Sequence, residues 1–211
     1  SSLPHSDVST SIKEKKENIW IAQRQGRSKD SNDLTQDSLL KMFRLGGTGT
    51  IIERLQQLHI VPTSISYEYD PCDYLKAKEF QLKRDYPDYK KTMADDLESM
   101  QTGILGYKGR VHYQLAACMD EWLGTLDDKQ HKTKLYPIIS SHIDREIHCN
   151  YRLYANNYIA YDKLNKCSRF ANLYSKEEEE RFEHYLKQQI SKIKLPNPDL
   201  DYLEYCILTM Y

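Results

Sequence analysis

Hydrophobic positions in the first third of the chain change between strand spacing and helical spacing. The apolar run 19–22 predicts a buried strand, and the run 60–66 predicts a second one. Between them, apolar residues at helical spacing predict a helix over 39–45 and a shorter helix over 51–58. Because helices alternate with strands here, the pattern favours an α/β fold built around a sheet.

The rest of the chain shows mainly helical spacing. Residues 111–115 predict a third strand. Further helices are expected over 74–84, 92–102, 136–149, 157–165, 176–193 and 199–210. The acidic run 177–180 follows Ser175, which has capping-box spacing with Glu178, so we interpret the run as the first turn of a helix.

A basic loop comes directly after the first predicted strand. It contains Arg24, Gly26, Arg27, Ser28 and Lys29. Guanidinium groups bind phosphate or carboxylate oxygens bidentately, and a glycine lets the backbone approach a ligand closely. Ligands of α/β sheets bind at the carboxyl ends of strands. The loop therefore predicts a site for a phosphorylated small molecule, and the alternative is a solvated basic loop.

Composition limits the class of partner. The 211 residues include 30 lysines and arginines against 31 aspartates and glutamates, which gives a formal net charge of −1. Because no global charge steers the chain to a polyanion, we expect no nucleic-acid partner. The apolar runs fall short of the ~20 residues that a membrane-spanning helix needs, so we expect a soluble or peripherally bound chain.

The cysteines and the first residues of the sequence favour the cytoplasm. The five cysteines (Cys72, Cys118, Cys149, Cys167 and Cys206) are dispersed and form no C-x-x-C pair. This dispersal argues against a disulfide framework and against a thiolate zinc site. The sequence does not begin with the basic and apolar regions of a signal peptide.

Two further patterns have both a functional and a structural interpretation. His142, Glu146 and Cys149 share one face of a predicted helix, a spacing that suits a metal ion with one further ligand. Packing with a solvated edge explains the same spacing and is favoured, so we expect no metal. The seventeen tyrosines indicate either a surface that meets lipid headgroups or, as we favour, partly buried rings with satisfied hydroxyls.

Two segments resemble motif blocks of the glycerol-3-phosphate and 1-acylglycerol-3-phosphate (lysophosphatidate) acyltransferase family. Residues 25–29, Gln-Gly-Arg-Ser-Lys, resemble the block that binds the acceptor's phosphate in that family. Residues 60–65, Ile-Val-Pro-Thr-Ser-Ile, resemble the later apolar Val-Pro block that packs beside the site. The resemblance extends over most of the chain, and the two blocks are informative as an ordered pair.

The chain departs from the family pattern in two places. Gln25 stands where a glutamate is often found, which removes a negative charge beside the phosphate site. The family's H-x-x-x-x-D block, whose histidine acts as general base while its aspartate orients the imidazole, is missing. None of the seven histidines is followed by an aspartate five residues later. Cys72 and His112 are conceivable substitutes, but the sequence shows no orienting partner for either, so we assign no catalytic residue.

The resemblance implies a partial acyltransferase-type mixed sheet with flanking helices and a helix-rich C-terminal half. We expect residues 1–115 to form the C-terminal part of an acyltransferase α/β domain and residues 116–211 to form a helical extension packed on it. The missing block is expected upstream of the basic loop, in an N-terminal segment of the same protein that this chain lacks. The chain itself is therefore expected to be incomplete for catalysis.

The implied activity is transfer of a fatty acyl group to a glycerophosphate or lysophospholipid. Acyl-CoA or acyl-carrier protein would be the donor, as a co-substrate and with no cofactor. The reaction would take place peripherally at the inner membrane surface, on the cytoplasmic side. In this chain Arg24, Gly26, Arg27, Ser28 and Lys29 would bind the acceptor phosphate.

Two other functions remain open at this point. The chain is a non-catalytic module that binds phosphate or lipid, or docks on a membrane, or it is a small-molecule phosphotransfer or sugar-phosphate enzyme that uses the same anion loop. The last is least favoured, since no nucleotide or metal motif accompanies the loop.

Overall fold

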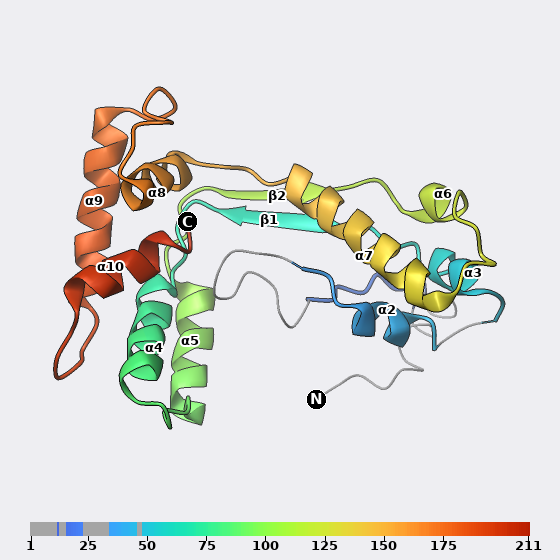
Figure 1. The fold of residues 1–211 in the computed structure, drawn as a ribbon, viewed down its shortest axis with the longest axis horizontal. Coiled ribbons are helices and arrows are strands. Elements are labelled where there is room, and N and C mark those ends of the chain that lie inside the picture. Colours follow the sequence, from blue (N-terminus) through green and yellow to red (C-terminus); the bar gives the residue numbers. More distant parts are fainter. Residues whose placement is uncertain (1–11, 13–15, 23–33, 46–47) are drawn as a thin grey trace. The chain divides into compact units, whose positions relative to one another are not determined.

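The structure is a computed structural model that describes residues 12, 16–22, 34–45 and 48–211 (Figure 1). Helices predominate, and the described residues form one sheet of two strands. The chain divides into two compact units, and each is assembled from separate stretches of sequence. Unit 1 takes residues from Ser1–Ser28, Asn32–Ile65 and Tyr113–Tyr151. Unit 2 takes Lys29–Ser31, Ser66–His112 and Arg152–Tyr211.

Unit 1 is built around two helix pairs. Its elements are α2 (Asp37–Phe43), α3 (Ile51–Gln56), α6 (Asp120–Leu123) and α7 (Lys132–Cys149). Helix α2 packs on α7, and α3 packs on α6. The core of this unit contains the buried side chains of Leu40, Leu55, Met119, Leu123, Leu135 and Ile139. Apolar burial of this kind contributes about 25 cal/mol per Å² of surface removed from water, so the pairing of these helices rests mainly on this core.

In the described residues of unit 2, the regular structure outside its share of the strands is helical. Its helices are α4 (Asp73–Asp85), α5 (Met93–Leu105), α8 (Ala155–Asn165), α9 (Lys176–Ser191) and α10 (Leu200–Leu208). Helix α10 packs against α4, α8 and α9. The core contains Ala77, Ile159, Phe182, Leu186, Leu203 and Ile207. The expected capping box begins α9, with reciprocal hydrogen bonds between Ser175 and Glu178.

A buried carboxylate lies at the centre of unit 2. Asp73 has no exposed surface and accepts hydrogen bonds from Tyr185 Oη at 2.7 Å, Tyr211 Oη at 3.1 Å and Gln189 Nε2 at 2.6 Å. Burial raises the pKa of Asp73 to about 6, although these donors favour the charged form and oppose the shift. The network therefore links α4, α9 and Tyr211, which follows α10, at the cost of a desolvated acid.

Helix α5 exposes its apolar face, whereas the other helices of unit 2 bury apolar side chains in the core. Its inner face is small and polar: Cys72 Sγ donates to the Ser99 carbonyl, and a Cβ on Gly103 would lie 3.5 Å from Cys72 Sγ. The opposite face carries an exposed apolar stripe of Met93, Leu97, Met100 and Ile104. The spacing of four, three and four residues places this stripe along one side of the helix.

The sheet pairs β1 (Thr63–Tyr67) with β2 (Val111–Leu115) in antiparallel register. Backbone hydrogen bonds from Ala116 N to Pro62 O and from Glu68 N to Arg110 O close its two ends at 2.9 Å each. Ser64 and Ser66 occupy the buried positions of β1, whereas Ile65 is only partly buried. The apolar side chains of this pair therefore lie mainly on its more exposed face.

Two of the three predicted strands are confirmed. Residues 111–115 form β2 with the expected bounds, and the strand expected over 60–66 begins three residues later, as β1. The strand expected over 19–22 is wrong: these residues have no regular secondary structure, and the Trp20 side chain is 63% exposed. Because Ile19 and Ile21 are only partly buried, the apolar run lacks the two-sided burial that the expectation assumed.

The predicted helices are present, with bounds that differ mostly at the first and last turns. The expected helix over 136–149 begins four residues earlier, at Lys132. The short helix α6 was not expected. In the part of the chain that the structure describes, no helix combines the length and hydropathy needed to cross a bilayer. The mixture of helices and strands agrees with a coarse α/β description.

Candidate functional site

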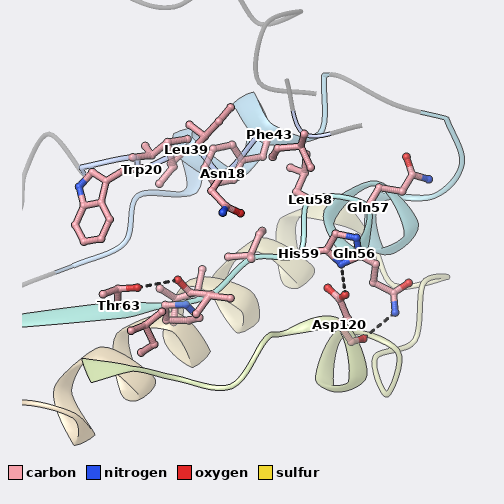
Figure 2. Close-up of a pocket in the computed structure, with 18 of the residues that line it drawn as sticks. Asn18, Trp20, Leu39, Phe43, Gln56, Gln57, Leu58, His59, Thr63 and Asp120 are labelled. Carbon is pink, nitrogen blue, oxygen red and sulfur yellow. Dashed lines mark hydrogen bonds and ion pairs between the residues drawn. The ribbon is translucent and has the colours of Figure 1, made fainter. Parts of the chain in front are cut away.

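An open groove of about 1840 Å³ lies in unit 1 (Figure 2). Residues 16–22 line it, together with side chains from α2, α3, β1, β2, α6 and α7. Its apolar wall includes Trp20, Leu39, Phe43, Leu58 and Val61. A mainly apolar, concave surface of this size suits a hydrocarbon chain.

The second motif block and the residues that come shortly before the first block both line this groove. Residues 19–22 and residues 60–63 both line it, although more than 35 residues separate them in the sequence. The five candidate phosphate-binding residues follow the first of these segments. Arg24, Gly26, Arg27, Ser28 and Lys29 lie outside the described residues, so their role remains a prediction.

A histidine and an aspartate face each other at the groove wall. His59 lies just beyond α3 and Asp120 begins α6, and their Nδ1 and Oδ2 atoms are 2.5 Å apart (Figure 2). Both residues line the groove. The backbone of His59 has a positive φ of 49°, which residues other than glycine rarely adopt. His59 therefore has an uncommon backbone conformation at this wall.

Further hydrogen bonds join the two segments that carry this pair. Gln56 Nε2 donates to the Asp120 carbonyl at 2.8 Å, and Met119 N donates to the Ile60 carbonyl at 2.9 Å. The Met119 side chain is buried in the core of unit 1. One side-chain-to-backbone and one backbone-to-backbone hydrogen bond therefore hold Asp120 opposite His59.

The Cys118 thiol lies beside this pair. One donor atom each of His59, Cys118 and Asp120 lies within 4.8 Å of the others. Burial raises the pKa of the Cys118 thiol and the nearby Asp120 carboxylate raises it further, so the free side chain stays protonated at neutral pH. Chemically, the group offers either an imidazole oriented by a carboxylate or a set of three different metal ligands.

Sequence reasoning did not find this cluster. The search for a histidine and aspartate five residues apart was local, whereas His59 and Asp120 are 61 residues apart. No periodic spacing connects them, because they meet through the packing of α3 on α6. The one available signal was the Cys118-x-Asp120 tripeptide, a spacing too common to indicate a site.

Other candidate residues have structural partners. The His142 ring stacks on Trp122 with centroids 3.6 Å apart, and Arg145 donates to its Nδ1 at 3.0 Å. These contacts account for His142 through packing on α6. Burial raises the pKa of Cys72, whose thiol donates to a backbone carbonyl, so Cys72 is not an activated nucleophile.

None of the protein-family models, curated proteins or solved structures compared with the chain matches it.

Proposed function

We propose that this chain provides the acceptor site of a glycerophosphate or lysophospholipid acyltransferase. The acyl chain of the acceptor lies in the groove of unit 1, and its phosphate is bound by Arg24, Arg27 and Lys29. The pair β1–β2 would be part of an acyltransferase-type sheet. Acyl-CoA or acyl-carrier protein is the donor, and the reaction takes place at the inner membrane surface.

One observation supports the proposal above the others. The block that resembles the family's Val-Pro motif and residues 19–22, which come shortly before the other block in the sequence, line the same apolar groove. The basic loop continues directly from residues 19–22 on that wall, which places several cations within a few residues of an apolar surface. An amphiphile with an acyl chain and an anionic head matches this combination of surfaces.

Tryptophan fluorescence offers a direct binding test. Trp20 lines the groove, and the sequence contains one other tryptophan, Trp122. In a Trp122→Phe background, lysophosphatidate below its micelle concentration is expected to shift the Trp20 emission to shorter wavelengths, because the acyl chain removes the indole from water. Monoacylglycerol, which lacks the phosphate, is expected to bind more weakly.

Two variants distinguish the contact with the lipid's acyl chain from the contact with its phosphate. Arg27→Ala is expected to weaken lysophosphatidate binding by ~10- to 100-fold, since a charge-assisted hydrogen bond contributes roughly 1.5–3 kcal/mol. The same variant leaves monoacylglycerol binding unchanged. Val61→Asp on the groove wall weakens both ligands, whereas Ile104→Asp on the exposed stripe of α5 is the matched control and weakens neither.

The outcomes decide between the candidate functions. No emission shift with either lipid contradicts the groove as the acyl site, and an equal loss of both lipids in Arg27→Ala contradicts the phosphate role. A thioester-release assay with acyl-CoA then tests catalysis by this chain. Binding without release favours the non-catalytic lipid-binding module, and release by this chain alone would show that it contains its own base.

A further inference from the structure

We propose that His59, Cys118 and Asp120 form a binding site for a divalent transition-metal ion, of the zinc class, at the wall of the unit 1 groove. The inference is independent of the acyltransferase proposal, because it rests on the three side chains and their scaffold alone. In the described part of the chain, this is the one group of at least three His, Cys, Asp or Glu side chains with donor atoms so close together.

The ligand chemistry selects the class of ion. The group offers one imidazole nitrogen, one sulfur and one carboxylate oxygen. Zinc binds all three donor types in four-coordinate sites, and three protein ligands leave a position for water or a substrate oxygen. Magnesium and calcium prefer oxygen donors throughout, so a thiol and an imidazole disfavour them.

The distances allow coordination after a small side-chain movement. Two nitrogen or oxygen ligands each about 2.0 Å from a tetrahedral zinc ion lie roughly 3.3 Å apart. His59 Nδ1 and Asp120 Oδ2 are 2.5 Å apart, so the metal would separate them by less than 1 Å. Both side chains have room for this movement, because the His59 side chain is 69% exposed and that of Asp120 is 31% exposed.

One carboxylate oxygen of Asp120 is buried without a hydrogen bond among the described residues. Its Oδ1 atom is inaccessible to solvent and has no hydrogen-bond partner within the described residues. A carboxylate oxygen in this situation is costly unless an opposite charge or a donor satisfies it. A metal cation bound between the three side chains supplies that charge.

The scaffold holds the ligands in place before the metal binds. Cys118 and Asp120 flank Met119, which is buried and hydrogen-bonded to Ile60, the residue that follows His59. Gln56 holds the Asp120 carbonyl from α3. Both ligand-bearing segments are thus tied to each other next to the ligands, an arrangement that lowers the ordering cost of coordination.

Binding replaces a proton by the metal and involves no redox change. The thiol proton of Cys118 passes to the solvent buffer as the metal–sulfur bond forms, and His59 binds through Nδ1 as the neutral imidazole that carries its proton on Nε2. The bound ion would place a positive charge at the groove wall, where His59 and Asp120 already lie. An anionic oxygen of a groove ligand could then occupy the fourth position.

Cobalt titration of the full chain tests the site with a spectroscopic signature. Under reducing conditions, Co²⁺ is expected to produce a near-ultraviolet thiolate-to-cobalt charge-transfer band, which Zn²⁺ then abolishes by displacement. Cys118→Ser removes the band and weakens Zn²⁺ binding, measured by calorimetry, at least about tenfold. His59→Gln also weakens Zn²⁺ binding at least about tenfold, while the thiolate band persists at saturating Co²⁺.

Cys149→Ser is the matched control, because Cys149 is an exposed cysteine of the same unit outside the cluster. It is expected to keep the band and the affinity of the unmodified chain. The proposal is overturned if Co²⁺ gives no charge-transfer band, if the band survives in Cys118→Ser, or if Cys149→Ser loses it equally. Circular dichroism of each variant shows whether a lost band reflects a lost ligand or a lost fold. If Cys118→Ser unfolds, the zinc affinity of His59→Gln tests the site instead. An unchanged zinc affinity in His59→Gln contradicts the site.

Discussion

At the scale of single residues, Asp73 shows how an acid can position a core and still reduce its stability. Three side-chain donors surround its carboxylate, yet desolvation raises its pKa to about 6. The folded state therefore retains the proton at pH values where the unfolded chain, with an ordinary aspartate near 3.8, has released it. Because the native state binds more protons in this window, stability falls as pH rises.

The first stability prediction follows from this decrease of stability with rising pH. Asp73 is expected to favour folding fully below about pH 4 and to lose this contribution between about pH 4 and pH 6. The loss amounts to about 3 kcal/mol, since one pKa unit corresponds to 1.36 kcal/mol. Asp73→Asn removes the titration, so its free energy of unfolding, measured with urea at several pH values, should fall less across this window than that of the unmodified chain. Asp88→Asn, at an exposed aspartate, is the control, and parallel profiles for Asp73→Asn and the unmodified chain would contradict the assignment.

At the scale of elements, α5 shows that apolar residues at helical spacing need not be buried. Its stripe repeats at the same helical spacing as a core face, but Met93 is 81% exposed and Ile104 is 69% exposed. The face that packs on Cys72, the residue before α4, is the small, polar one that contains Ser99 and Gly103. The stripe therefore contributes little to the folding of this chain.

A pair of substitutions compares the contributions of the exposed stripe and of the unit 2 core to stability. Leu97→Gln on the stripe is expected to change the free energy of unfolding by no more than about 0.5 kcal/mol, because the side chain is already in water. Leu203→Ala in α10 should cost about 2–5 kcal/mol, because Leu203 has no exposed surface and its truncation leaves a cavity. Urea denaturation of both variants measures the contrast. A loss of more than 2 kcal/mol in Leu97→Gln would show that something covers the stripe.

Periodicity predicted most elements and failed where burial decided the outcome. The helices and β2 were recoverable because their side-chain spacing and caps are local signals, as in the Ser175 box of α9. Residues 19–22 have strand-like composition, but an apolar run forms a strand only when a neighbouring strand satisfies its backbone groups. The His59–Asp120 pair depends on helix packing between distant segments, which no local pattern records.

At the scale of the whole molecule, the two compact units interleave along the sequence. The chain passes from unit 1 into unit 2 within β1 and returns within β2, so each strand contributes to both. It enters unit 2 again after Tyr151. The expected acyltransferase domain over 1–115 with an extension over 116–211 stays a prediction about family relationship; the units themselves are not consecutive segments.

This interleaving has a consequence for synthesis on the ribosome. The last residues of unit 1 are made at Tyr151, whereas α4 ends at Asp85 and its packing partner α10 begins only at Leu200. At 5–20 residues per second, the buried face of α4 waits roughly 6–23 s for that partner. During this interval α4 and the exposed stripe of α5 present apolar surface together on a tethered loop. We therefore expect a chaperone that binds apolar segments to contact the nascent chain in this interval, after the last residue of unit 1 has been made.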